Sequence, residues 1–314
     1  MSERAELRLV GPGGEPVELA RTLASHGFAD LTPHTLDEDA HTLETTFALG
    51  RGARTVRISP GRRGYAAIES VGKPFGRDRD RILAVVAHTL RLDEDLSPFY
   101  ELAASDPALD WVTTGAGRML RSPTVFEDVV KTVCTTNCAW SGTVRMVGAL
   151  VDHLGPVDRA TGRHAFPSPE AMAEADESFF RDVARAGYRG AYLLTLAASV
   201  AEGSLDLEEL TASTSPDLPD DEVVERLLAL PGVGPYAAAH VMMLLGRYSR
   251  LIFDSWTRPK YMEVTGARKR VADRTIERRF RRYGRYAGLA FWLLLTRSWV
   301  AEDGTTAARA SAPG

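Results

Sequence analysis

A short stretch rich in glycine, proline and alanine constrains this chain more than any other part of it. The sequence from Leu228 to Gly246 reads LALPGVGPYAAAHVMMLLG, and a run with apolar residues three and four apart, 222–230, leads into its glycines. This spacing predicts a helix that stops at the Pro-Gly pair, and Pro235 suits the first turn of a second helix. Gly232 and Gly234 permit the positive φ angles of a tight hairpin. The free N–H groups of the glycine turn and of the second helix then form a concave donor surface that suits a phosphate oxygen.

The composition indicates a folded protein. The chain has 314 residues, 44% of them hydrophobic, enough for one large domain or two to three small ones. It contains no run of 18 apolar residues, and its charged start, MSERAE, lacks the apolar region of a signal peptide. We therefore expect a cytoplasmic protein. The two cysteines, Cys134 and Cys138, are too few for a four-cysteine zinc or iron–sulfur site and are interpreted as core residues.

Positive charge gathers in one part of the sequence. The formal net charge is −4, but residues 250–285 contain 12 Lys and Arg residues against four acidic ones, a local net charge of +8. Clustered cations close to a backbone phosphate site are the pattern expected of a nucleic-acid-binding face. A solvated helix face is the alternative for the patch taken alone.

The first part of the chain favours strands and the rest favours helices. Residues 1 to about 72 contain four β-rich runs separated by Gly and Pro turns, with one helix among them near 17–26. The runs are 6–10, 41–49, 54–59 and 65–70. From residue 78 onward the apolar spacing is helical, and Thr124 with Glu127 forms a capping box before a helix over 126–137. The fold class expected is α+β, with an N-terminal antiparallel sheet domain followed by a mainly α-helical region.

One aspartate narrows the set of proteins that the hairpin resembles. Asp254 lies 20 residues after Gly234, at the end of a short apolar run. A Leu-Pro-Gly-Val-Gly hairpin followed by an aspartate at this distance resembles the helix-hairpin-helix DNA glycosylase superfamily, which includes endonuclease III, and within it the branch of the 8-oxoguanine and 3-methyladenine DNA glycosylases. Three further segments resemble the same superfamily, so that the resemblance covers about 97–299. These segments are 134–150, the Gly-Tyr-Arg loop at 187–192 and the opening of the last helix at 283–288.

The resemblance implies a two-lobed helical core that follows the sheet domain. We expect the sheet domain over 1–92, a first helical lobe over 93–215, and a second lobe with the hairpin and the aspartate over 216–302. Residues 303–314 are expected to form a flexible tail.

The resemblance also implies a site for a nucleotide that has been turned out of the duplex. Asp254 matches the catalytic carboxylate, which stabilises positive charge on the sugar and orients water as the N-glycosidic bond breaks. A plain helix cap is the alternative. Asn137, with Thr136 beside it at a helix tip, matches the residue that fills the space of the extruded base, or else it is only a C-cap. The other DNA contacts expected are Gly232, Val233, Gly234, Arg258 and Lys260.

At one position this chain differs from the members of the superfamily that also cleave the DNA strand. Those members carry a Schiff-base lysine two residues after the second glycine, where this chain has Tyr236, and 235–246 contains no lysine. The resemblance therefore implies a monofunctional glycosylase, and an aromatic residue here favours alkylated, cationic purines. Tyr236 and His240 are expected to line the base pocket, although packing explains His240 equally well. Trp256 is expected in the pocket or, alternatively, in the core.

Two other functions stay open. One is a non-catalytic helix-hairpin-helix protein that binds damaged DNA, and the other is an 8-oxoguanine-type glycosylase without the lysine. The partner expected is double-stranded damaged DNA, bound by a monomer that is associated with the nucleoid if the host is bacterial. No iron–sulfur cluster and no other cofactor are expected, because no four-cysteine set follows Asp254. Members often hold a monovalent cation on hairpin carbonyls, here those of Leu228, Leu230 and Val233.

Overall fold

A five-stranded antiparallel sheet opens the chain. The computed structural model describes residues 3–50 and 52–300, so the predicted tail, 303–314, lies outside the described residues. The strands pair in the order β1-β5-β4-β3-β2, and every pair is antiparallel. Their bounds are β1 Arg4–Arg8, β2 His34–Asp37, β3 Thr42–Leu49, β4 Gly52–Pro60 and β5 Tyr65–Ser70. The predicted α+β fold class is confirmed. The sheet has one strand more than predicted, because β2 is short and has no apolar alternation.

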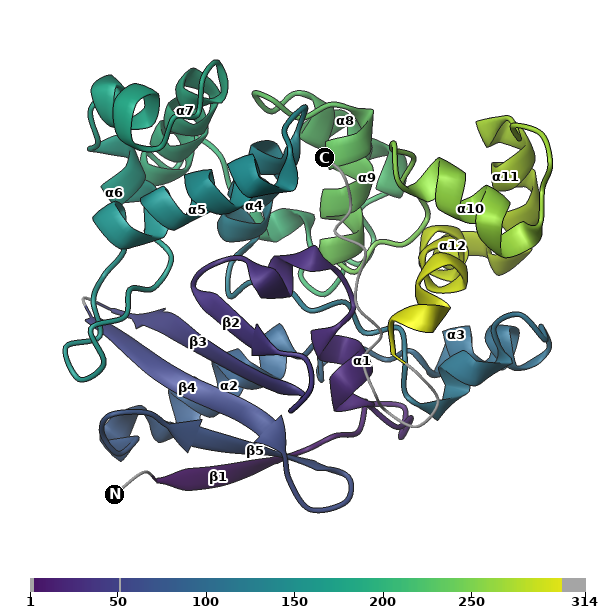
Figure 1. Cartoon of the computed structure of the whole chain (residues 1–314), viewed down its shortest axis with the longest axis horizontal. Helices are drawn as coiled ribbons and strands as arrows, with labels where there is room; N and C mark the ends of the chain where they lie inside the picture. The colour runs from purple at the N-terminus through teal and green to yellow at the C-terminus, as the bar shows by residue number, and fades with distance from the viewer. Residues whose placement is uncertain (1–2, 51, 301–314) are drawn as a thin grey trace.

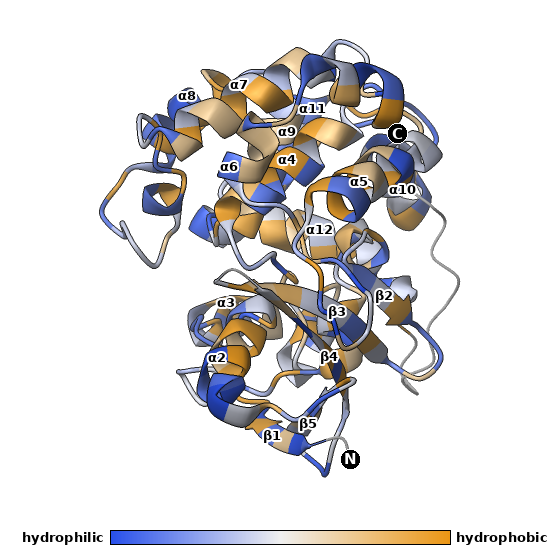
Figure 2. Cartoon of the chain, turned by 90° about the vertical axis from the view of Figure 1, so that its left-hand side faces the viewer, coloured by the Kyte–Doolittle hydropathy of each residue, from blue (hydrophilic) through white to orange (hydrophobic). Residues whose placement is uncertain are grey.

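Helices form most of the remaining chain. They are α1 Leu19–Leu23, α2 Arg79–Thr89, α3 Ser97–Ala104, α4 Val125–Thr135, α5 Trp140–Leu154, α6 Pro169–Ala173, α7 Arg189–Ala201, α8 Asp220–Leu228, α9 Pro235–Leu244, α10 Thr257–Thr265, α11 Asp273–Phe280 and α12 Ala287–Thr296. Figure 1 shows α2 behind the sheet, and Figure 2 shows the sheet domain below the helical part. In the part of the chain that the structure describes, no helix is both long and apolar enough to cross a bilayer.

One face of the sheet holds the first hydrophobic core. Leu43 and Phe47 of β3 lie on the same face because side chains alternate along a strand. Leu43 pairs with Ile58 of β4, and all three side chains are at most 1% exposed. They pack with Ile82 and Val86 of α2, which explains why the amphipathic helix lies across the back of the sheet.

Two further cores meet on α9. This helix is apolar on every side, as expected of a helix buried within a domain. Val241 and Met242 belong to the core built with α4, α5 and α7, whereas Ala239 and Met243 belong to the core built with α10 and α12. The helix that follows the glycine turn is therefore the central element of the helical part.

The segment after the sheet domain packs against the C-terminal helices. Phe99 of α3 lies 5.3 Å from Tyr286, between ring centroids, and the stretch from Leu96 to Met119 contributes to the core of α10 and α12. The residues expected as a first lobe, 93–215, are thus divided between two cores, because α3 and the loop after it run back toward α12.

A buried group of charged residues lies on α4. Thr124 caps the helix as predicted, with its Oγ1 accepting the N–H of Glu127 at 3.3 Å, but the Glu127 carboxylate pairs with Lys131 Nζ at 2.6 Å. Asp128 is 3% exposed and accepts the N–H of Ser122 at 3.0 Å. Burial raises the pKa of Asp128 to about 6, against the opposing effects of the Ser122 hydrogen bond and the Lys131 charge.

We predict that Asp128→Asn stabilises the protein near neutral pH by up to about 3 kcal/mol, because it removes a buried charge and keeps an acceptor for Ser122. The folded-state pKa lies above the ordinary value of 3.8, so the carboxyl group costs nothing below 3.8 and most above pH about 6. The stabilisation by Asp128→Asn should therefore decrease as the pH falls from about 6 to 3.8. Thermal unfolding of both proteins at about pH 7.5 and about pH 4.5 measures it. Lower stability of the variant at both pH values would show that the interactions of the carboxylate outweigh its burial.

Candidate functional site

The hairpin predicted from the glycine-rich stretch is present between α8 and α9. The N–H of Val233 donates to the carbonyl of Leu230 across the turn at 3.2 Å. Gly232 has a φ of 80°, and a Cβ there would lie 2.8 Å from Cδ2 of Tyr192, so this position requires glycine. Gly234 differs, with a φ of −99° and a ψ of −176°, and a Cβ there would have no atom within 4 Å. The expectation of positive φ at both glycines is wrong for Gly234, which is the N-cap of α9.

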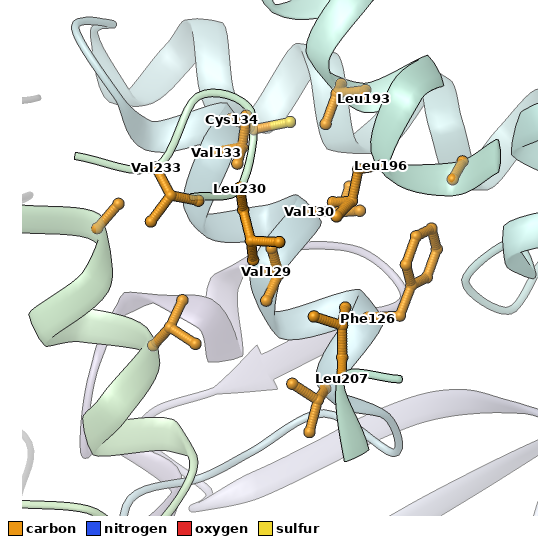
Figure 3. Close-up of a cluster of buried hydrophobic side chains, with 14 of the residues drawn as sticks. Phe126, Val129, Val130, Val133, Cys134, Leu193, Leu196, Leu207, Leu230 and Val233 are labelled. Carbon is orange, nitrogen blue, oxygen red and sulfur yellow. The ribbon is translucent and has the colours of Figure 1, made fainter. Parts of the chain in front are cut away.

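Apolar packing fixes the turn and leaves one side of it open. Leu230 and Val233 are 9% and 6% exposed, and Figure 3 shows both beside Val133 of α4. Helices leave their first N–H groups without intrahelical partners, and the space beside Gly234 is free. A phosphate oxygen can therefore approach the start of α9.

Asp254 lies in the loop before α10 and caps that helix. Its Oδ1 accepts the N–H groups of Trp256 at 2.9 Å and of Thr257 at 2.6 Å. The N–H of Asp254 donates to Oγ1 of Thr257 at 2.9 Å, and its carbonyl accepts from Arg258 Nη1 at 3.0 Å. The cap role proposed as an alternative is thus real, and it is compatible with catalysis because these bonds use Oδ1 and fix the orientation of Oδ2.

Tyr236 lies between the end of α4 and Asp254. Burial raises the pKa of its phenol, the negative charge of Asp254 raises it further, and a hydrogen bond with the Thr135 side chain opposes both effects. Tyr236 also lines a cavity of about 300 Å³ together with Phe253 and Arg258. Tyr236, in the first turn of α9, therefore packs against both helical cores and faces the loop that contains Asp254.

An aromatic row extends from Tyr236 into the sheet domain. The ring of His240 meets Tyr236 edge-on at 6.0 Å and stacks on Phe28 at 5.0 Å and 19°, and His26 lies edge-on at 5.9 Å from His240. His240 is 7% exposed and its Nε2 has no hydrogen-bond partner. Burial lowers the pKa of His240 to about 4, which keeps the ring neutral. No sequence pattern indicates Phe28 or His26, because they lie more than two hundred residues before their partner in the chain.

The tip between α4 and α5 is exposed at Asn137. Asn137 has a φ of 46°, a left-handed conformation that Asn tolerates better than most residues. Its Nδ2 donates to the hydroxyl of Tyr188 at 3.3 Å, and Arg189 donates to the carbonyl of Thr136. Two segments that sequence motifs indicated separately, the tip and the Gly-Tyr-Arg loop, are thus in contact.

The two predicted phosphate-binding cations are engaged within the protein. Arg258 forms a two-pronged ion pair with Asp273, at 3.0 Å from Nε and 2.8 Å from Nη2. Lys260 pairs with Glu263 at 2.7 Å and lines a different cavity, of about 800 Å³, with Trp111. Arg258 therefore stabilises the loop that contains Asp254. Lys260 does not line the cavity that Tyr236 lines.

Trp256 lies in the core. It is 8% exposed and its ring lies 5.6 Å from that of Trp292 and 5.5 Å from that of Trp299. This arrangement favours the alternative in which Trp256 lies in the core and not in the base pocket.

The basic patch lies on α11, in the loop before it and in the short 3-10 helix after it, Arg281–Tyr286. Among the residues of this patch, those that are exposed and for which the structure shows no ion pair are Arg268, Lys269, Arg270, Arg274, Arg278, Arg279, Arg281 and Arg285. Other members pair with acidic residues, such as Arg250 with Asp221 and Arg282 with Asp106. Across residues 3–50 and 52–300, no three His, Cys, Asp or Glu side chains are grouped to hold a metal ion.

The chain is similar in sequence to DNA glycosylases, although no family model matches it. A putative DNA-3-methyladenine glycosylase of Bacillus subtilis is 31% identical over 91 residues, 29% of this chain and 30% of the relative. A DNA-3-methyladenine glycosylase of the same organism is 25% identical over 174 residues, 54% of this chain and 56% of the relative. An N-glycosylase/DNA lyase of Arabidopsis thaliana is 31% identical over 189 residues, 56% of this chain and 50% of the relative. The chain thus spans between 30% and 56% of the length of these curated relatives.

Solved structures share the fold over almost the whole chain. A 3-methyladenine DNA glycosylase from Archaeoglobus fulgidus has a TM-score of 0.70 at 18% identity and covers 93% of this chain and 97% of its own. An 8-oxoguanine glycosylase/lyase from Clostridium acetobutylicum has a TM-score of 0.67 at 20% identity and covers 94% of this chain and 98% of its own. The shared fold and the sequence matches agree with the resemblance that the hairpin motif indicates: the chain is similar in sequence and in fold to DNA glycosylases of the 3-methyladenine and 8-oxoguanine types.

Proposed function

We propose that the protein is a monofunctional DNA glycosylase of base-excision repair that flips an alkylated purine out of the duplex and hydrolyses its N-glycosidic bond with Asp254. The observation that carries the proposal is the position of Tyr236, which packs against both helical cores and lines one cavity with Phe253, the neighbour of Asp254, and with Arg258, which donates to the Asp254 carbonyl. The hairpin, the tip and the carboxylate are thus parts of one site. The relatives named above as DNA glycosylases support the same reaction class.

Different residues of the proposed site flip the nucleotide and hydrolyse the bond. The turn at 232–234 holds a backbone phosphate, and Asn137 at the tip fills the space that the extruded base leaves. As the bond from C1′ to the base nitrogen breaks, its electron pair leaves with the base and positive charge builds on the sugar. Asp254 stabilises that charge and accepts a proton from the water whose oxygen bonds to C1′.

Residues 235–246 contain no lysine, which argues for hydrolysis without strand cleavage. A Schiff base needs a lysine near C1′, and the matching position is Tyr236. Lys131 is fully buried and paired with Glu127, and Lys260 is paired with Glu263. We therefore propose that the product is an intact abasic site.

The aromatic row supports an alkylated purine as the substrate. Neutral His240, Phe28 and Tyr236 offer ring faces and edges, and Asp254 adds a negative charge nearby. Such surroundings attract a cationic base. A purine that is alkylated to a cation leaves as a neutral base, so it needs no general acid. A neutral oxidised purine remains the second candidate, because one structural relative is an 8-oxoguanine glycosylase/lyase.

We also propose a monovalent cation on the main-chain carbonyls of Leu228, Leu230 and Val233. Hard oxygen ligands in one tight turn suit a hard cation, and the turn is closed by the hydrogen bond from Val233 to Leu230. The ion would add positive charge behind the phosphate site.

Release of free bases tests the proposed function directly. Purified protein is incubated with duplex DNA that has been methylated or oxidised, and released bases are identified by mass spectrometry. The proposal expects methylated purines and no loss of strand continuity. Release of 8-oxoguanine alone would favour the second candidate, and binding of damaged DNA without any release would show a non-catalytic damage-binding protein.

We predict that Asp254→Asn lowers base release at least about 100-fold and leaves the affinity for lesion DNA within about threefold. The asparagine side chain keeps an oxygen for the N–H groups of Trp256 and Thr257, so the helix cap survives while the negative charge is lost. Single-turnover rates and binding isotherms on the same duplex measure the two effects. Unchanged turnover in this variant would remove Asp254 from the mechanism.

We predict that borohydride traps no covalent adduct between the protein and lesion DNA, because Tyr236 has no amine to form an imine. The assay is denaturing electrophoresis of labelled DNA after reduction, with a bifunctional glycosylase as the positive control. A trapped band with this protein would mean that another amine reaches C1′.

We predict that Gly234→Asp weakens binding to all duplexes alike and reduces the slope of log K against log salt by about 0.9, the contribution of one phosphate contact. The backbone of Gly234 is extended and unobstructed, and Asp is a favourable N-cap, so the fold should persist. Gly234→Ala is the matched control, because it adds bulk at the same place without charge. Loss of lesion preference with an unchanged salt slope would contradict a phosphate clamp at this position.

A further inference from the structure

A groove with a volume of about 800 Å³ lies apart from the proposed site. Residues of α1, α10, α11 and α12 line it, together with residues of two short 3-10 helices, Asp110–Thr114 and Arg297–Trp299. Figure 1 shows α10 and α11 above α12, and α3 below it. We call this space the α10–α12 groove. It shares no lining residue with the cavity that Tyr236 lines.

Part of the lining of the α10–α12 groove is apolar. Leu294 and Leu295 are 7% and 1% exposed and belong to the core built with α10 and α12. Val264 of α10 is 42% exposed. Trp111 is half-buried, and its ring N–H donates to the carbonyl of Ala108 at 3.2 Å. An aliphatic or aromatic side chain that entered the groove would therefore leave water for apolar surface, which is favourable.

Cations line the same groove. They come from α1, α10, α11 and the 3-10 helix after α12, and Glu263 is the acidic residue of the lining, so the formal net charge is +3. Lys260 pairs with Glu263, whereas Arg279 is exposed, donates to the hydroxyl of Tyr261 at 3.0 Å and has no ion pair among the described residues. The four cations are Arg21, Lys260, Arg279 and Arg297.

The combination of apolar surface and cations differs from that of a nucleic-acid-binding face. Phosphate contacts along a duplex need exposed cations and no apolar cavity. Arg274 and Arg278 of α11 are of that kind, because they are exposed and do not line the groove. An apolar centre with a charged rim is typical of protein–protein interfaces, and clusters of basic side chains recognise acidic motifs.

We propose that the α10–α12 groove docks an acidic linear peptide segment of a partner protein. Aliphatic or aromatic side chains of the segment pack on Val264 and Leu294, and its carboxylates pair with Arg279 and Lys260. Because the cations belong to four separate elements, a chain with several carboxylates can meet them together, which one compact anion cannot. The inference is independent of the glycosylase activity, since neither the hairpin nor Asp254 lines the groove.

Binding of labelled peptides to the full chain tests the proposal. The probes are two short fluorescein-labelled peptides in which aspartate alternates with leucine or with phenylalanine, and fluorescence anisotropy gives the Kd. We expect at least one probe to bind with a Kd below about 0.1 mM and more weakly as salt is added. Versions with asparagine for aspartate, or serine for the apolar residue, should bind at least about 10-fold more weakly. No binding of either probe at about 1 mM, or equal binding of the asparagine version, would overturn the proposal.

Two variants with matched controls locate the bound peptide. Arg279→Glu reverses a charge of the groove, Val264→Asp places a carboxylate on its apolar surface, and each should weaken binding at least about 10-fold. Arg278→Glu makes the same charge change one residue away, and Leu102→Asp changes an apolar residue of α3 that is 40% exposed. Neither control residue lines the groove, so both should stay within about twofold of the wild type. All four positions are exposed, so the fold should persist. Equal losses in variants and controls would show general electrostatic attraction and contradict docking in the groove.

Three further measurements test other occupants, and a positive result in any of them would overturn the proposal. Displacement of the probe by undamaged duplex DNA would assign the groove to the nucleic-acid-binding face. Tighter binding of a synthetic peptide of residues 301–314 than of either probe would assign it to this chain's own segment. A dimer in sedimentation that Val264→Asp disrupts would assign it to a second copy. Base release by Val264→Asp without peptide should equal that of the wild type, and a loss would place the groove in the DNA site instead.

Discussion

The packing of the glycine turn against α4 is the contact on which the rest of the site depends. Leu230 and Val233 are buried on the two sides of Gly232 and belong to the same core as Val133 of α4. Val133 lies one helical turn before Asn137, so the turn and the tip are parts of one close-packed unit. Protein interiors of this density do not deform gradually. A shift of the glycine turn would therefore carry the tip with it, so that the turn and the tip keep a fixed relative position.

Three buried arginines differ from the buried His240 in their hydrogen bonding. Arg189, Arg91 and Arg247 are all at most 7% exposed, and each donates to main-chain carbonyls that would otherwise lack partners. A delocalised guanidinium is well suited to this use because it is weakly hydrated and has five donors. His240, by contrast, has an unpaired Nε2, and burial alone lowers its pKa. These three arginines are thus bonded to main-chain oxygens, while the aromatic row beside Tyr236 is kept neutral.

The sequence predicts local structure, but it does not predict contacts between distant segments. The hairpin, the Thr124 cap and the sheet follow from glycine, proline and alternation patterns that act within a few residues. The stacking of Phe28 on His240 joins the sheet domain to α9, and no spacing rule links such positions. Arg258 illustrates a second limit. Its charge predicts a phosphate contact, but the sequence does not indicate its ion pair with Asp273, fifteen residues further on, which folding brings alongside.

The spacing between the glycine turn and Asp254 has a simple geometric origin. The 10 residues of α9 carry the chain about 15 Å away from the hairpin, at 1.5 Å per residue. The stretch after α9 is not helical, and an extended chain recovers about 3.3 Å per residue, so fewer than ten residues suffice to return. The return brings Phe253, the neighbour of Asp254, back to Tyr236 near the start of α9, since both side chains line the same cavity. There Oδ1 of Asp254 accepts the N–H groups of Trp256 and of Thr257, the first residue of α10. The aspartate at this distance is specific where the hairpin alone is not, because it requires a helix that leaves the turn, a non-helical segment that comes back, and a second helix start that fixes the carboxylate.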